Sequence, residues 1–311
     1  MKLLLFTHKS DIDGMGNAIL ASLAFKDLEY ILCTNVHDLD ERIIKEQQKG
    51  YLYNFDYIYI TDLSISKEVA EILYQDKKLN NKIHIFDHHE TPLKNGLNIY
   101  PNVTIEIKNN NTLTCATKIF YNYLTKEKYL ESNNILDEFT EMIRKEDTYD
   151  WKRTNDQKSH DLAILYQSLG PKKFINEMIY KIKNNDKFIF TKEENNLIDC
   201  KKEEIKDKIN TYLKTLEIIN IDKYKIGVCF ITYEYRNEVA DYLLDIKMDI
   251  DAVAMIALDN SQISLRSIKD PYAPRIIAEK YQGGGHNSAA AIPLTKTRRL
   301  SIIDTIFTTT K

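Results

Sequence analysis

KLLLFTHKSDIDGMGNAILASLAF, residues 2–25, begins with a continuous apolar run and continues with apolar residues at helical spacing. The run Lys2–Thr7 is typical of a strand that is covered on both faces. In Gly14–Phe25, apolar residues recur every four positions from Met15 onward, which predicts an amphipathic helix. The first 25 residues therefore predict a buried strand followed by a helix.

Two more runs of the strand type follow in the first third of the chain. They are YIYIT at Tyr57–Thr61 and KIHIF at Lys82–Phe86, both rich in β-branched and aromatic residues. Between them, Ser64 or Ser66 can cap a helix that runs through Tyr74. Strands that alternate with helices in this way predict an α/β fold, with a mostly parallel sheet and helices on both faces.

The middle of the chain predicts helices. The asparagine-rich residues 102–111 indicate a loop or a weak edge strand, and helices are expected at Cys115–Leu124 and Leu136–Lys145. From Pro171 to Leu216, lysine and glutamate surround apolar residues at helical spacing. This pattern favours one or two long connecting helices over a low-complexity linker.

The last third changes character and predicts a smaller, mixed α/β domain. Expected elements are strands at 225–232, 252–258 and 262–266, and helices at 235–244 and 274–281. We therefore predict a first domain at residues 1–170, a helical connector at 171–221 and a C-terminal domain at 222–311.

Composition excludes several classes of protein. The 311 residues are 43% hydrophobic and 29% charged, which rules out disorder as the main state. A net charge of −3 argues against a protein that holds long nucleic acid by neutralising phosphates. The four cysteines lie far apart, and there is neither a signal-peptide pattern nor a run of about 20 apolar residues. These features predict a cytoplasmic protein that does not span a membrane.

Acidic and histidine side chains follow the ends of all three predicted strands. A single aspartate after a strand is usually a turn or cap residue, but in an open parallel sheet the carboxyl ends lie along one edge. Carboxylates packed there repel one another unless cations neutralise them. Aspartate and histidine without thiolate suit Mn²⁺, Fe²⁺, Co²⁺ or Zn²⁺, and so many donors suggest two metal ions. The residues are His8, Asp11, Asp13, Asp62, Asp87, His88 and His89.

The other histidines have different surroundings. His84 lies inside a predicted strand and is expected to be packed or hydrogen-bonded, while His37 and His160 read as ordinary surface or loop residues. The triplet Gly283–Gly285 precedes His286 and a helix-like run of small residues at 287–291. Glycines let the backbone approach a phosphate or carboxylate closely, although a flexible turn would look the same.

Arg266 closes the predicted strand QISLR just before that segment. Its guanidinium could bind a phosphate with two hydrogen bonds. A surface ion pair is the equally plain alternative.

Six segments resemble a known superfamily in order along the chain. THKSDIDG (7–14), ITDLS (60–64), FDHHET (86–91) and KEDTYDW (145–151) resemble the four motifs of the DHH phosphoesterases. SLRS (264–267) and YQGGGHNSAAA (281–291) resemble the DHH-associated C-terminal domain. The resemblance implies a DHH catalytic domain first and a substrate-binding domain last.

The resemblance also implies a role for each motif residue. Two divalent metal ions, usually Mn²⁺, are expected. His8 and Asp11 would bind one ion, Asp13, His88 and Asp147 the other, and Asp62 would bridge them. Asp150 competes with Asp147 for the last position. The catalytic candidates are His89, facing the phosphate, and Asp87, orienting a histidine. The residues that would bind the substrate across the interdomain cleft are Arg266, Ser267, Gly283, Gly284, Gly285 and His286.

Within the superfamily, the chain looks most like the bacterial oligoribonucleases that degrade nanoRNA. This implies hydrolysis of very short RNA to 5′-mononucleotides. The alternatives are a phosphodiesterase of linear or cyclic dinucleotides, a phosphatase of phosphoadenosine phosphate, and a metal-containing nucleotide sensor without turnover. The sequence indicates no obligate protein partner, and it leaves open whether the chain forms a homodimer.

Overall fold

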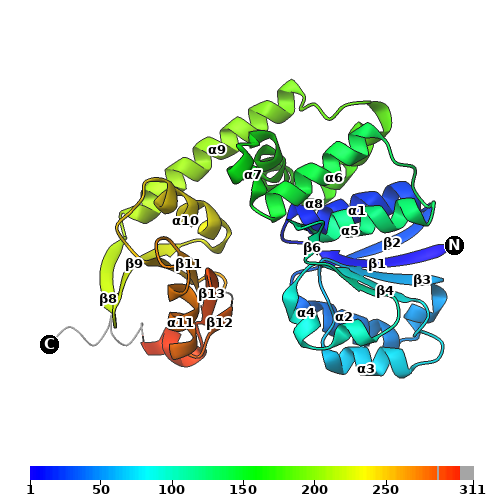
Figure 1. Ribbon diagram of the computed structural model, residues 1–311, viewed down its shortest axis with the longest axis horizontal. Helices are drawn as coiled ribbons and strands as arrows, with labels where there is room; N and C mark the ends of the chain where they lie inside the picture. The colour runs from blue at the N-terminus through cyan, green and yellow to red at the C-terminus, as the bar shows by residue number, and fades with distance from the viewer. Residues whose placement is uncertain (286, 302–311) are drawn as a thin grey trace. The chain divides into compact units, whose positions relative to one another are not determined.

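The computed structural model describes residues 1–285 and 287–301, and the chain divides into two compact units, Met1–Lys201 and Lys202–Lys311 (Figure 1). The three-part division with a connector at 171–221 stays a prediction. In the structure this stretch contains the second half of helix α8 (Gln157–Asn184) and all of α9 (Lys192–Leu213). The boundary between the two units falls within α9.

The first unit is built on a five-stranded sheet in which every pairing is parallel. The strand order is β2-β1-β3-β4-β5, so the three strands predicted from the sequence lie side by side. The strands are β1 (Lys2–His8), β2 (Asp27–Cys33), β3 (Tyr57–Thr61), β4 (Ile83–Asp87) and β5 (Val103–Ile105). The prediction of a mostly parallel sheet is confirmed.

Helices cover both faces of this sheet, as predicted (Figure 1). On one face lie α1 (Ile12–Ala24) and α5 (Ala116–Lys126), with α6 (Asn134–Asp147) and α8 (Gln157–Asn184) packed against α1. On the other face lie α2 (Val36–Gln48), α3 (Lys67–Gln75) and α4 (Glu90–Lys94). Ser66 caps α3 by accepting a hydrogen bond from the amide of Val69 at 3.3 Å, which decides between the two serines proposed for that cap.

The connecting segments include features that the sequence pattern did not predict. Strand β2 was missed because its sequence, DLEYILC, mixes charged with apolar residues at an edge of the sheet. Helix α8 begins at Gln157, earlier than predicted, and is interrupted at Gly170, where φ is 69° before Pro171. The remaining elements are α7 (Asp150–Thr154) and two 3₁₀ turns at Tyr51–Asn54 and Leu97–Ile99.

The asparagine-rich stretch forms the edge strand β5 and then a small hairpin. The hairpin consists of β6 (Lys108–Asn109) and β7 (Thr112–Leu113). Asn110 and Asn111 make its two-residue turn with φ of 48° and 65°, a conformation that asparagine tolerates better than most residues. The expectation of a weak edge strand is confirmed.

The second unit is a mixed α/β unit, as predicted, with a six-stranded sheet in the order β12-β13-β11-β10-β9-β8. Among its described strands, β9 and β10 pair in parallel and the other pairs are antiparallel. The strands are β8 (Glu217–Ile221), β9 (Tyr224–Ile231), β10 (Ala252–Ala257), β11 (Gln262–Ser267), β12 (Gly284–Gly285) and β13 (Ala289–Pro293). Its helices include α10 (Arg236–Asp245) and α11 (Ala273–Lys280), with a 3₁₀ turn at Tyr233–Tyr235, and residues 296–301 are also helical.

The interpretation of residues 287–291 as helix-like was wrong. Ala289–Ala291 belong to β13, which pairs antiparallel with β11 so that Ala289 lies opposite Arg266. Alanine has a high intrinsic helix propensity, but pairing with β11 on one side and β12 on the other overrides it. His286 lies outside the described residues.

His84 is packed as predicted, in an aromatic cluster on β4. Its ring centroid lies 5.2 Å from that of Tyr59 and 5.5 Å from that of Tyr57. Burial lowers the pKa of His84 from 6.5 to about 4. The folded protein therefore binds fewer protons at this position than the unfolded chain does between these two pH values.

We expect this histidine to destabilise the protein in acid. As the pH falls from about 6.5 to about 4, the free energy of unfolding should fall by roughly 3 kcal/mol through His84. Urea unfolding of His84→Phe and of the wild type at pH 7.5 and 5.0 measures this contribution. An equal loss of stability in both proteins between the two pH values would contradict it.

Candidate metal centre

The carboxyl ends of β1, β3 and β4 bring the predicted donors together at one edge of the first sheet. Together with Asp147 at the end of α6, their ligand atoms form three groups among the described residues that could each hold a metal ion. The groups are His8, Asp11 and Asp62; Asp13, His88 and Asp147; and Asp62, His88 and His89. Asp62 and His88 each belong to two of these groups.

Asp62 lies between two histidines. Its Oδ2 is 3.4 Å from His8 Nδ1, and its Oδ1 is 3.4 Å from His88 Nε2. His8 Nδ1 is also 2.7 Å from Asp11 Oδ2. Asp62 follows β3 with φ of 60°, a left-handed conformation that a residue other than glycine adopts rarely, and mostly at special positions such as functional sites. Each oxygen of Asp62 thus faces a different group of donors.

Asp13 and Asp147 complete the surroundings of His88. The Nε2 atom of His88 lies 3.7 Å from Asp13 Oδ2, and its Nδ1 atom lies 3.5 Å from Asp147 Oδ2. The Asp13 carboxylate is fully buried and accepts hydrogen bonds of 2.8 Å from the amides of Ala116 and Thr117. Asp13 therefore fixes the N-terminus of α5 against the centre.

The electrostatics of the centre favour a bound cation. Burial and repulsion by Asp11 and Asp13 raise the pKa of Asp62. Burial alone would lower the pKa of His88, but Asp62, Asp147 and Asp13 raise it to about 11. Two buried atoms, Asp62 Oδ2 and His88 Nε2, have no hydrogen-bond partner among the described residues. The centre therefore fits a divalent ion. A cation would give the buried Asp62 Oδ2 atom a partner, and it would neutralise the carboxylates that raise the pKa of His88, so that the imidazole could bind in its neutral form.

The loop between His8 and Asp11 is held in place by its neighbours. A Cβ atom on Gly14 would lie 1.9 Å from the carbonyl oxygen of His8, so this close approach requires glycine. The buried Tyr166, on α8, donates a hydrogen bond from its hydroxyl to the carbonyl of Lys9. Sequence reasoning did not identify Tyr166, because nothing in its local sequence indicates a contact 157 residues away.

Asp87 orients His89 rather than His88. Its Oδ1 lies 2.7 Å from His89 Nδ1 and accepts the backbone amides of both histidines, while its Oδ2 accepts a 2.5 Å hydrogen bond from Ser64. Burial opposes protonation of His89, but the contact with Asp87 raises its pKa. The side chain of His89 is half exposed, so its other nitrogen is available to a ligand.

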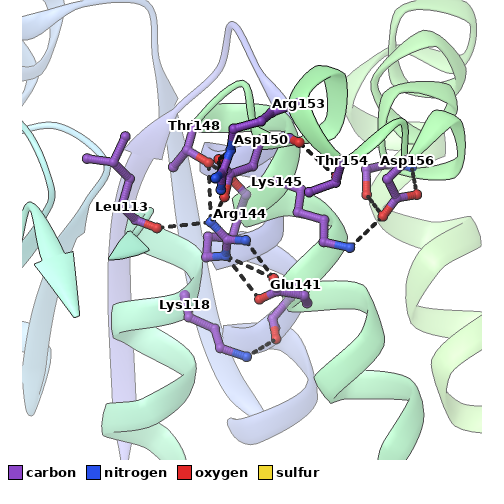
Figure 2. A network of polar contacts seen from close by, with 12 residues as sticks. Leu113, Lys118, Glu141, Arg144, Lys145, Thr148, Asp150, Arg153, Thr154 and Asp156 are labelled. Atoms are coloured by element: carbon purple, nitrogen blue, oxygen red, sulfur yellow. Dashed lines mark hydrogen bonds and ion pairs between the residues drawn. The ribbon is translucent and has the colours of Figure 1, made fainter. Parts of the chain in front are cut away.

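Asp150 does not share the surroundings of Asp147, because it lies in the polar network drawn in Figure 2. Asp150 Oδ2 is 2.9 Å from Arg144 Nη1, and its Oδ1 is 3.0 Å from Arg153 Nη2. These two guanidinium groups lower the pKa of Asp150. The structure therefore brings Asp147, and not Asp150, into the group of donors, and it assigns Asp150 to an ion-pair network.

Comparisons with known proteins agree with this centre. Residues 2–144 match the DHH family, N-terminal domain. The oligoribonuclease NrnB of Bacillus subtilis is 30% identical over 293 residues, which cover 94% of this chain and 72% of NrnB. The chain belongs to the DHH family. It is a metal-dependent phosphoesterase.

Solved structures show the same fold at low sequence identity. A pGpG-specific phosphodiesterase, PggH from Vibrio cholerae, aligns with a TM-score of 0.55 and 16% identity, covering 99% of this chain and 98% of that one. The DHH domain of a member of a ribosomal-protein family aligns with a TM-score of 0.61 and 12% identity, covering 97% of this chain and 85% of that one.

In the second unit of this DHH protein, Arg266 contacts uncharged acceptors. Its guanidinium donates to the carbonyl of Leu265 at 3.0 Å and to Asn237 Oδ1 at 3.1 Å. Burial and the nearby Arg236 lower its pKa to about 10. No carboxylate of the described residues lies at hydrogen-bond distance from the Arg266 guanidinium. The surface ion pair, which was the alternative for Arg266, is therefore not supported.

Gly283, Gly284 and Gly285 differ in their surroundings. A Cβ on Gly283 or Gly285 would meet the carbonyl oxygen of Ala291 at 2.1 Å or of Ala289 at 2.6 Å, whereas Gly284 faces open space. Close packing of strands therefore explains two of the glycines. Ser267 donates its backbone amide to the carbonyl of Ser288 at 2.9 Å.

The membrane prediction can be examined over the described part of the chain. Among residues 1–285 and 287–301, no helix has both the length and the apolar character needed to cross a bilayer. The cytoplasmic location stays a prediction.

Proposed function

We propose that this DHH protein hydrolyses very short RNA oligonucleotides to 5′-mononucleotides. The observation that carries the proposal is the position of Asp62 between two groups of donors, which provides for two adjacent cations. Paired cations suit hydrolysis of a phosphodiester, whose negative charge increases in the transition state. The similarity to an oligoribonuclease over 94% of the chain supports short RNA as the substrate.

The ligand assignment expected from the sequence is part of this proposal. His8 and Asp11 would hold one ion and Asp13, His88 and Asp147 the other. Asp62, whose Oδ1 lies 3.4 Å from His88 Nε2, would hold both. Carboxylate and imidazole donors without a thiolate are compatible with Mn²⁺. When bound, two such ions would activate a water and neutralise charge on the phosphate.

His89 and Asp87 would act on the phosphate rather than on a metal ion. The carboxylate of Asp87 holds Nδ1 of His89 and favours its protonated form. The proton on Nε2 can then be donated to a non-bridging phosphate oxygen. Protonation of the leaving oxygen by His89 is the alternative role.

The substrate-binding residues expected in the second unit remain part of the proposal. They are Arg266, Ser267, Gly283, Gly284, Gly285 and His286, of which His286 lies outside the described residues. Arg266 supplies a positive charge that no hydrogen-bonded carboxylate of the described residues neutralises. A net charge of −3 for the whole chain suits a small substrate better than a long polyanion.

A linear dinucleotide is the second candidate substrate. It is the shortest member of the same chemical class, and the fold is that of a phosphodiesterase specific for pGpG. A sensor without turnover is less favoured, because every donor type expected of a DHH phosphoesterase is assembled at the centre.

Hydrolysis of a substrate panel by the purified protein with Mn²⁺ tests the proposal. The panel contains two- to five-residue RNA, matching DNA, a long single strand, a cyclic dinucleotide and phosphoadenosine phosphate, with products resolved by chromatography. Preferential release of 5′-mononucleotides from the short RNA is expected. Preference for another member would move the function to that substrate, and binding of metal and nucleotide without hydrolysis would favour the sensor.

Replacement of Arg266 should chiefly weaken substrate binding. We expect Arg266→Ala to raise KM roughly tenfold or more with a smaller change in kcat, because a charged hydrogen bond to phosphate contributes about 1.5–3 kcal/mol. Steady-state kinetics on a three-residue RNA measure the effect, with Arg275→Ala, an exposed arginine of α11, as the control. An unchanged KM would assign Arg266 a purely structural role.

A further inference from the structure

A cavity of about 390 Å³ lies between the β6–β7 hairpin and helices α5 and α6 of the first unit. It is distinct from the three groups of metal donors and is lined mainly by polar side chains. Those relevant to a ligand are Asn109, Asn110, Lys118, Asn122, Glu141 and Arg144.

Most of the charge around this cavity is neutralised by ion pairs (Figure 2). Arg144 is buried and binds Glu141 through Nε and Nη2, with the shortest contact, to Oε1, at 2.7 Å. The same guanidinium binds Asp150 at 2.9 Å, and Asp150 in turn binds Arg153. Two guanidinium groups and two carboxylates thus form a network without net charge.

Lys118 is the exception. Its half-buried ammonium donates to Thr140 Oγ1 at 3.2 Å and lies 5.5 Å from the centre of the Tyr121 ring. Within residues 1–285 and 287–301, no carboxylate forms an ion pair with Lys118. The cavity therefore has a net positive charge, and an anion is the ligand that would neutralise it.

Neutral hydrogen-bond donors surround this charge. Asn109, Asn110 and Asn122 line the cavity, and each carries a side-chain amide that can donate hydrogen bonds. Asn110 is held in a left-handed turn with φ of 48°, which fixes the tip of the hairpin. An ammonium together with amide donors suits the oxygen atoms of a phosphate group.

Two residues of the cavity wall are close in sequence to residues that contact or belong to the metal centre. Lys118 follows Thr117, whose amide binds the buried carboxylate of Asp13. Arg144 lies one helical turn before Asp147 on α6. Helices α5 and α6 therefore contribute to both the cavity and the candidate metal centre, within the same unit.

We propose that this cavity binds a second phosphate group of the nucleotide substrate, distinct from the one that is hydrolysed, with Lys118 as its main contact. This inference rests on the proposed function. Lys118 is then a specificity-determining residue, because substrates with a phosphate that reaches the cavity bind more tightly than those without one. Its role is in binding and not in the chemical step.

Kinetics of Lys118→Met, Lys118→Arg and Lys126→Met on RNA of two, three and four residues test this role. Lys126 is an exposed lysine at the end of the same helix and does not line the cavity. Lys118→Met should raise KM about tenfold for at least one of these lengths with kcat nearly unchanged. It should also reduce the slope of the logarithm of the binding constant against the logarithm of the salt concentration by about one, as expected for the loss of one phosphate contact. Lys118→Arg should resemble the wild type. Equal KM values and salt slopes for Lys118→Met and Lys126→Met would overturn the inference.

A measurement without turnover separates this site from the proposed function. Protein labelled with ¹⁵N at asparagine is titrated in EDTA with a 5′-phosphorylated three-residue RNA. Side-chain amide signals of Asn109, Asn110 and Asn122 should shift in the wild type and in Lys118→Arg, but not in Lys118→Met. Absence of shifts in the wild type overturns the inference even if the enzyme cleaves RNA. Shifts in a protein that cleaves none of the panel would support the phosphate site and overturn the proposed function.

Discussion

Asp62→Asn is expected to lower kcat on short RNA at least about a thousandfold, or roughly 4 kcal/mol in transition-state stabilisation. The two oxygens of the Asp62 carboxylate each face a different histidine of the centre. Its replacement would remove a ligand from both proposed ions together, whereas replacement of any other proposed ligand affects one. Steady-state hydrolysis of a three-residue RNA at saturating Mn²⁺ gives the comparison.

Asparagine is a better substitute here than alanine. Asp62 has φ of 60°, and asparagine accepts that left-handed conformation more readily than alanine does. The variant should therefore fold. Without metal it should be at least as stable as the wild type, because burial and repulsion by Asp11 and Asp13 already oppose the charged form of Asp62.

Thermal unfolding separates loss of the centre from loss of the fold. The wild type should gain stability as Mn²⁺ is added, since a ligand that binds only the folded state stabilises it by mass action. In Asp62→Asn this gain should be largely lost while the metal-free Tm is kept. A folded variant with normal turnover would contradict the two-metal assignment.

The sequence predicted the edge of the sheet on which the centre lies. Short apolar runs mark where each strand ends, and the carboxyl ends of parallel strands lie along the same edge. Every donor except Asp147, which ends helix α6, follows one of these short apolar strands. Adjacency of β1 and β3 did not depend on detecting β2, which pairs on the outer side of β1.

Other features could not be predicted because they depend on contacts between distant segments. Ala289–Ala291 have a strong local preference for helix, and only pairing with neighbouring strands such as β11 makes them a strand. In the sequence Lys118 cannot be distinguished from other lysines. Only the structure shows that the nearby carboxylates of Glu141 and Asp150 form ion pairs with Arg144 and not with Lys118. The position of Tyr166 under the His8–Asp11 loop is likewise a tertiary contact.

The choice between Asp147 and Asp150 illustrates the same limit and gives the second large expected effect. In the sequence the two aspartates are three residues apart within KEDTYDW, and either could face the strand ends. In the structure α6 ends at Asp147, and Tyr149 with φ of 65° turns the chain before α7 begins at Asp150. This turn places one carboxylate beside His88 and the other beside Arg144.

Asp147→Asn and Asp150→Asn should therefore fail in opposite ways. Asp147→Asn should lose at least about a hundredfold in activity (~2.7 kcal/mol) and most of its stabilisation by Mn²⁺, with an unchanged or higher metal-free Tm, because burial raises the pKa of Asp147. Asp150→Asn should lose about 1–3 kcal/mol of stability, because Arg144 is left buried with one partner fewer, while stabilisation by Mn²⁺ persists. Urea unfolding, Mn²⁺ titration and kinetics on the wild type and both variants give the comparison. If Asp150→Asn lost the metal response and Asp147→Asn kept it, the ligand would be Asp150 and the turn at Tyr149 would have to differ in the metal-bound protein.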